Sequence, residues 1–332
     1  MTTPPPPQHV PQHVPSQQAP PQQAPGQQPF PPQAPPQVPG QRQQEWQGQA
    51  PAGGSSLPMV RTHLGHALVS EWTKIRTVRS TVWTLALTVL LTVGIGLIFA
   101  AALSTDDYVG MPLLAGGFFG LMFGQLCVIS LGVLVITSEY GTGMIRTTLT
   151  ASPRRSRVLV AKALVFFALS FTVTLASTGL TALIHSSMLS DQTVPAYEYD
   201  NPDMEGSIEN GEIVATTGHW VDATLGASLY VALLGLLALA VGTLLRHSAG
   251  AISTMLGVVL VPLIAALFMA GESLRDLRDA LIEYSPLNGL ASMFRIPMVG
   301  EPGSGWTMLG LLAGVTAAAT IAALARLTTT DV

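Results

Sequence analysis

Six long apolar stretches constrain the fold of this chain more than any other feature. Each is 20 to 25 residues long and none contains Asp, Glu, Lys or Arg; they are Val82–Leu103, Pro112–Ile136, Ala163–Ile184, Ala223–Leu245, Ala249–Ala270 and Trp306–Ala325. About 20 helical residues cross a hydrocarbon core of roughly 30 Å, because each residue adds about 1.5 Å. We therefore predict an all-α, polytopic membrane protein with six transmembrane helices within residues 81–327.

The charged residues predict how these helices are oriented. When successive connections are placed alternately on the two sides of a membrane, the side that holds the N-terminus carries twelve Lys and Arg and four acids. The other side carries three Lys and Arg and fifteen acids. Short loops rich in Lys and Arg stay in the cytoplasm. Both termini are thus expected in the cytoplasm, and the Arg- and Ala-rich composition is typical of a bacterial plasma-membrane protein.

Two segments precede the first apolar stretch. Residues 1–58 contain 17 Pro and 15 Gln, a composition typical of a disordered tail with polyproline-II character. This tail is either a solvated extension or a partner-binding segment. Residues 60–80 place Leu64, Leu68, Trp72 and Ile75 on one helical face. Basic residues lie close to this face. The segment is therefore either an amphipathic helix that lies on the membrane lipids or a basic segment that only ends the translocated part of the chain before the first span. The residues expected at the membrane interface are Trp72, Lys74, Arg76 and Arg79.

Small residues recur every four positions in two of the apolar stretches. The first set is Gly116, Gly120 and Gly124, and the second is Gly310 and Gly314. Glycine at this spacing lets two helix backbones approach closely. Two interpretations fit the pattern: a seam between two subunits, or helix packing within one chain.

Two outer connections have recognisable patterns. Loop 186–222 carries eight acids and no Lys or Arg. Its residues 201–212 match several positions of a twelve-residue calcium loop, with Asn201, Asp203, Glu205 and Glu212 as candidate ligands. A solvated acidic loop that binds no metal is the other interpretation. Segment 271–305 has leucines at i, i+3 and i+7, which predicts a short amphipathic helix in a re-entrant or interfacial position.

Several classes of function are disfavoured by missing motifs. Neither of the two lysines lies in a Gly-x-x-x-x-Gly-Lys-Ser/Thr loop, so the chain has no such site for nucleotide phosphates. No charged or His residue lies inside an apolar stretch, which disfavours ion-coupled carriers. We expect no enzyme activity, no bound cofactor and no nucleic-acid partner.

The inner connection over residues 138–158 holds the most informative motif. Gly141 and Gly143 should break the second membrane helix, and Thr142 can cap a new short helix. Ile145 and Leu149 share one face of that helix, and Pro153 ends it. An exposed Ile–Leu face favours the binding of a partner protein. The other interpretation is a basic loop that only sets the orientation of the helices in the membrane. The basic residues of this loop are Arg146, Arg154 and Arg155.

This loop resembles the ABC-2 permeases, which are membrane subunits of ATP-binding-cassette transporters. The family has an acidic residue at the end of span two, then a Gly-Thr pair, a short basic helix and a Pro-Arg step. Here these positions are Glu139, Gly141-Thr142, Arg146 and Pro153-Arg154, and Ser70–Ser80 resembles the helix that precedes span one in that family. The likeness extends over residues 60–327.

The resemblance implies a function and partners. The short helix would be the coupling helix that docks on a separate ATPase subunit, with Glu139 holding the loop. ATP and Mg would act through that ATPase, and the permease would pair as a homodimer or heterodimer. Alternating access would then export an amphipathic or hydrophobic substrate. The alternatives are an ATPase-independent channel or secondary carrier, and a membrane scaffold that acts through its tail.

Overall fold

The computed structural model describes residues 63–105, 108, 110–144, 155–201, 204, 206–296, 298 and 305–329. All of these residues belong to the second of the two units into which the chain divides, Val60–Val332. The predicted tail over residues 1–58 lies outside them. So do Ile145, Arg146, Leu149, Pro153 and Arg154 of the predicted coupling loop.

The described part of the chain is mostly helical, and six helices are long and apolar enough to cross a membrane. They are α2 (Arg79–Leu103), α3 (Gly117–Gly141), α5 (Arg155–Leu189), the continuous run Thr217–Leu245, α8 (Ser248–Leu267) and α11 (Gly305–Thr329). The run Thr217–Leu245 consists of α6 (Thr217–Val221), a π-helical turn η3 (Asp222–Gly226) and α7 (Ala227–Leu245). The predicted number of membrane-length helices is confirmed.

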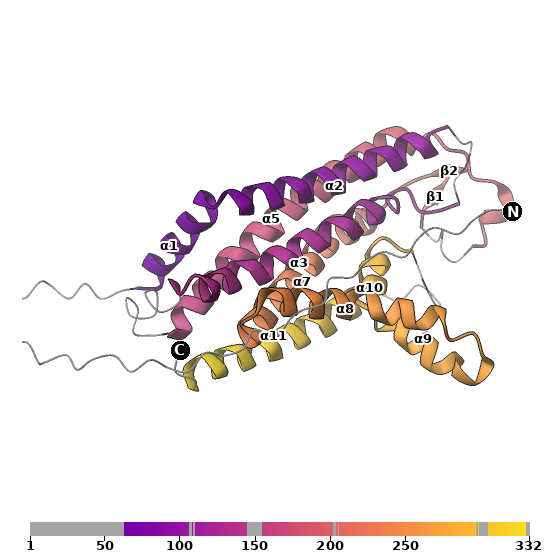
Figure 1. Ribbon diagram of the computed structural model, residues 1–332. Coiled ribbons are helices and arrows are strands. Elements are labelled where there is room, and N and C mark those ends of the chain that lie inside the picture. The colour runs from indigo at the N-terminus through magenta and orange to yellow at the C-terminus, as the bar shows by residue number, and fades with distance from the viewer. Residues whose placement is uncertain are drawn as a thin grey trace, which may run out of the picture. The chain divides into compact units, whose positions relative to one another are not determined.

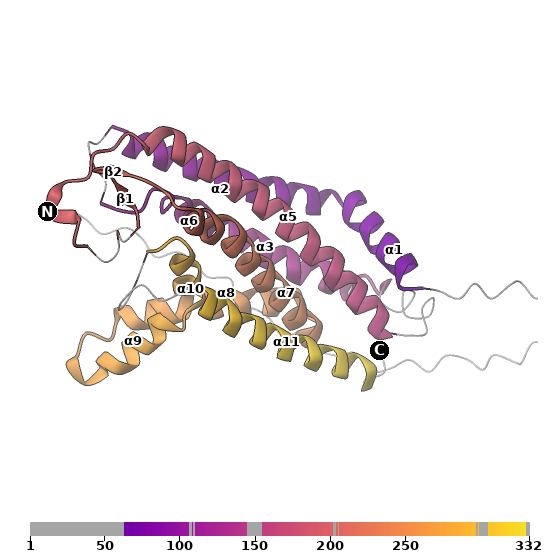
Figure 2. The same cartoon turned by 180° about the vertical axis from the view of Figure 1, so that it is seen from behind.

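The helices pack around a core that centres on α3 and α7. Helix α3 packs against α2 and α7, α5 packs against the same two helices, and α11 packs on α7 (Figures 1 and 2). Buried side chains from α3 and α7 supply much of the core, among them Leu121, Ile129 and Leu234. The start of α1, the end of α3 and the end of α11 lie at the same end of this bundle (Figure 1).

Two of the helices extend past the ends of the apolar stretches that predict them. Helix α3 continues past Ile136 to include Glu139, and α5 begins before Ala163 to include Lys162. His185 also lies within α5, and its side chain is fully buried with Nε2 3.0 Å from the Gly96 carbonyl oxygen. The apolar stretches themselves hold no charged or His side chain, but the helices that contain them do near their ends, where pairing and hydrogen bonding let such residues be buried.

A separate helix, α1 (Leu64–Thr77), precedes the first spanning helix. Val78 has extended backbone angles and separates α1 from α2. The two helices therefore meet at an elbow, and the sequence-predicted helix over residues 60–80 ends earlier than expected. The buried residues of α1 are Glu71 and Ile75.

The other end of the bundle carries the short elements. These are η1 (Ala196–Glu198), β1 (Ile208–Glu209), β2 (Glu212–Ile213), η4 (Glu272–Leu274), α9 (Arg275–Glu283) and α10 (Pro286–Met293). Strands β1 and β2 pair antiparallel, with Ile208 opposite Ile213 and Glu209 opposite Glu212. Asn210 and Gly211 form the turn, both at positive φ, as an Asn-Gly hairpin favours. The predicted amphipathic helix is present as α9, which projects away from the other helices (Figure 1).

The two glycine sets differ in their surroundings. A Cβ on Gly120 would collide with the Thr92 backbone oxygen, one on Gly124 would lie 2.5 Å from Thr92 Oγ1, and one on Gly116 would collide with His185. This set therefore packs within the subunit, against α2 and α5, and the interpretation as a seam between subunits is wrong for it. A Cβ on Gly310 or Gly314 would meet no described atom within 4 Å, so that face of α11 is open.

Candidate functional site

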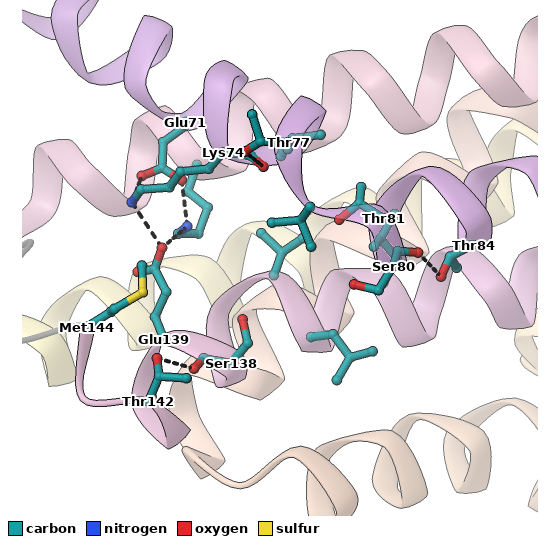
Figure 3. A pocket seen from close by; sticks show the side chains of 16 residues that line it. Glu71, Lys74, Thr77, Ser80, Thr81, Thr84, Ser138, Glu139, Thr142 and Met144 are labelled. Carbon is teal, nitrogen blue, oxygen red and sulfur yellow. Dashed lines mark hydrogen bonds and ion pairs between the residues drawn. The ribbon is translucent and has the colours of Figure 1, made fainter.

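Four charged side chains from three helices form one connected group where α1, α3 and α5 meet (Figure 3). We call Glu71, Lys74, Glu139 and Lys162 the charge cluster. Lys162 Nζ lies 2.5 Å from Glu71 Oε2 and 2.8 Å from Glu139 Oε1. Lys74 Nζ lies 2.7 Å from Glu71 Oε1 and 3.0 Å from Glu139 Oε1. Each ammonium group thus bridges both carboxylates, and the cluster has no net charge.

The cluster is largely shielded from solvent. Glu71 and Lys162 are each 2% exposed, and Glu139 is 5% exposed. The Lys74 side chain is 29% exposed and closes the cluster on its outer side. Moving charges out of water is costly, and the cost is offset only when each charge is well paired. The cluster therefore holds α1, the end of α3 and the start of α5 in one arrangement.

Sequence reasoning identified Glu139 but missed Glu71 and Lys162 as members of the same cluster. A signal for Glu71 exists, because it continues the apolar face of α1 at positions 64, 68, 71 and 75. A carboxylate on such a face needs a buried cation. The structure also corrects the predicted face, since Trp72 is 44% exposed and Glu71 takes the buried position.

The ion pairs hold Lys74 in its charged form. Burial alone would lower the pKa of Lys74, but the hydrogen bond to Glu71 and the charges of Glu71 and Glu139 raise it above its ordinary value. A raised pKa in the folded state means that the stabilisation by Lys74 is fully present below the unfolded-state pKa of about 10.4. It is lost as the pH rises through the folded-state value.

This shift predicts how the variant Lys74→Met depends on pH. The difference in unfolding midpoint between the native protein and this variant should be constant from neutral pH to about pH 10 and should shrink above it, as Lys74 loses its proton. Thermal unfolding in detergent across this range measures it. A difference that disappears already between pH 7 and pH 9 would contradict the assignment.

A groove of about 420 Å³ lies beside the charge cluster, between α1, the start of α2 and the end of α3 (Figure 3). Glu71, Lys74, Glu139 and Lys162 all line it. Its apolar lining is Ile75, Val78, Leu131, Leu134, Val135 and Met144. Its hydroxyl lining is Thr77, Ser80, Thr81, Thr84, Ser138 and Thr142. One side of the groove is therefore charged, and the remainder combines apolar side chains with hydroxyl groups.

Three of the predicted coupling-loop residues are described in full. Glu139 belongs to the charge cluster, Gly141 is the last residue of α3, and Thr142 is its C-cap. The Thr142 hydroxyl donates to the Ser138 carbonyl oxygen over 2.8 Å, so its observed role is to end α3. Gly143 has φ of 72°, a value that favours glycine, as the predicted break requires. Arg155 is the first residue of α5.

The predicted lipid-facing residues occupy different positions. Trp72 and Arg76 are exposed on α1, and Arg79 begins α2 and is also exposed. Lys74 instead points into the charge cluster, so it is not an exposed surface cation like Arg76 and Arg79.

The calcium-loop template fits only part of the observed loop. The Asn201 amide donates to Glu198 Oε2 over 2.6 Å, and Glu212 lies in β2 opposite Glu209. Asp203 and Glu205 lie outside the described residues. Among the residues that the structure describes, no three His, Cys, Asp or Glu side chains are grouped as a metal site would require. Calcium binding stays a prediction.

The sequence matches no protein-family model and no curated protein.

Proposed function

We propose that this chain is the permease subunit of an ATP-binding-cassette transporter of the ABC-2 type. The observation that carries the proposal is the charge cluster, because Glu139 and Lys162 stand on the two helices that bracket the loop with the ABC-2-like motif. Glu71 ties the same two helices to α1. A displacement of that loop is thereby passed to three helices together.

The proposal assigns each part of the chain a place. The end of the bundle that holds α1, the end of α3 and the end of α11 faces the cytoplasm of a bacterial cell, as the distribution of Lys and Arg favours. Helix α1 lies in the inner membrane interface with Trp72 and Arg76 toward the lipid headgroups. The tail over residues 1–58 extends into the cytoplasm.

The proposed mechanism is alternating access driven by a separate ATPase subunit. ATP and Mg bind that subunit, and its closure pushes on the coupling helix that Ile145 and Leu149 form. The charge cluster transmits the push to α1, α3 and α5, and two permease subunits rock to export an amphipathic or hydrophobic substrate. Within the described residues, the open face at Gly310 and Gly314 offers a place for close contact with a second permease.

The substitution Ile145→Asp tests the proposal. A carboxylate at the centre of an apolar docking contact is left unpaired and buried, so we expect the recovery of a co-purified ATPase to fall about tenfold or more. Quantitative mass spectrometry of the complex purified from its native membrane measures this recovery. The matched control is Thr147→Asp, which adds the same charge on the opposite side of the expected helix and should leave recovery unchanged.

Two outcomes would overturn the proposal. The first is a native protein that is purified without any ATPase and stays alone when candidate ATPases are co-expressed; a channel or carrier would then be favoured. The second is a loss of the cellular function when residues 2–58 are deleted, together with full cellular function of the Ile145→Asp variant. This result would favour a membrane scaffold that acts through its N-terminal tail.

A further inference from the structure

The groove beside the charge cluster contains polar groups whose bonding capacity is unused. Glu139 Oε2 is buried and has no hydrogen-bond partner, although Oε1 of the same carboxylate accepts from both lysines. A buried carboxylate oxygen without a donor raises the free energy of the folded state, because the water that solvated it is not replaced. Lys74 has three N–H donors and uses two of them on Glu71 and Glu139. Beside the groove, the charge cluster thus holds one buried acceptor that no donor satisfies and one ammonium N–H of the partly exposed Lys74.

The charge balance of the cluster limits what can bind there. Two ammonium groups and two carboxylates already cancel, so a ligand with a net charge would place an uncompensated charge in a largely buried site. A ligand with both a donor cation and an acceptor anion keeps the balance. The donor would satisfy Glu139 Oε2, and the acceptor would bond to Lys74.

The apolar part of the groove suits a hydrocarbon chain and opens outward. Leu131 and Val135 lie deeper on α3, and the half-exposed residues at the edge are Val78, Leu134 and Met144, at 46%, 38% and 46% exposure. The groove lies where α2 begins and α3 ends. The ends of spanning helices lie at the depth of lipid headgroups, so an amphiphile reaches the groove from the bilayer.

We propose that this groove binds one phospholipid with a phosphoethanolamine-type headgroup, which carries a primary ammonium and a phosphate and has no net charge. The ammonium donates to Glu139 Oε2, the phosphate accepts from Lys74 Nζ, and one acyl chain lies along Leu131, Leu134 and Val135. A phosphocholine headgroup has the same charge but no N–H to donate, and a phosphoglycerol headgroup adds a net negative charge. The inference goes beyond the proposed transport function and requires only that the six helices span a bilayer.

Competition between lipids in native mass spectrometry tests this site. The full-length protein, delipidated in detergent and without any ATPase, is given equal amounts of phosphatidylethanolamine, phosphatidylcholine and phosphatidylglycerol with identical acyl chains. We expect one phosphatidylethanolamine to be retained about tenfold more than either competitor, as one charge-assisted hydrogen bond provides. Equal retention of the three lipids, or a preference for phosphatidylglycerol, would overturn the proposal.

A pair of size-matched substitutions locates the bound lipid. Leu134→Trp places a large ring in the groove and should abolish selective retention. Leu90→Trp adds the same ring on α2 at a position that is 66% exposed and does not line the groove, so retention should persist. Selective retention that survives Leu134→Trp, or that both variants lose equally, would show that the lipid binds elsewhere. This experiment contains no ATPase, so a negative result would not contradict the permease proposal. Likewise, a protein that binds no ATPase could still bind the lipid in this groove.

Discussion

Replacing Lys162 with Met is expected to lower the free energy of unfolding by about 3–5 kcal/mol, the largest effect of any single substitution considered for this protein. Met fills a similar volume but carries no charge. Glu71 and Glu139 then face each other with Lys74 as their one remaining partner within the cluster. Two buried carboxylates with one cation leave an uncompensated negative charge at the junction of α1, α3 and α5. Denaturant or thermal unfolding in detergent measures the loss.

Two further variants separate charge balance from packing. The double variant Lys162→Met with Glu71→Gln again has no net charge in the cluster, and it should recover a substantial part of the lost stability. Arg76→Met removes a cation from an exposed position on α1 and should change stability by at most about 0.5 kcal/mol. A loss for Lys162→Met as small as that for Arg76→Met would show that the cluster does not hold the three helices together.

Replacing Gly120 with Leu should destabilise the protein by about 1–3 kcal/mol or more. A Cβ at this position collides with the backbone oxygen of Thr92 on α2, and a backbone atom cannot move aside as a flexible side chain can. Helices α2 and α3 must therefore separate along their contact. Thermal unfolding in detergent, together with the amount of protein in the membrane, measures the effect.

Gly179→Leu is the matched control for this helix contact. It makes the same substitution within α5, where a Cβ meets no described atom within 4 Å. Leu has a higher helix propensity than Gly by somewhat less than about 1 kcal/mol, so this variant should be neutral or slightly more stable. Equal destabilisation by both substitutions would mean that the α2–α3 contact is not close-packed.

Local patterns predicted several elements well. The length of each apolar stretch predicts a spanning helix, since hydrocarbon leaves the backbone little choice but internal hydrogen bonds. The leucine spacing in residues 274–281 predicts α9. The glycine break after Glu139 is also confirmed, with α3 ending at Gly141. Each of these features depends on residues that are close together in the chain.

The candidate site could be predicted only in part. Glu139 is recognisable from the motif that follows it, but the other two buried members of the cluster, Glu71 and Lys162, are 68 and 23 positions away in the chain. Hydropathy ends the two predicted membrane helices short of Glu139 and Lys162, because a charged side chain ends an apolar stretch. A buried cluster with no net charge lets the helices continue through it, and pairing of this kind depends on which helices are neighbours.

The sequence by itself determined that the chain has six membrane-length helices and roughly which residues form each of them. Only the tertiary structure decided that both lysines bind the same two glutamates, that Gly120 and Gly124 pack against α2 within one subunit, and that a groove opens beside Glu139. The physical reason is the range of the interactions. Helix formation depends on neighbours within a few residues, whereas ion pairs and close packing depend on which helices fold against one another.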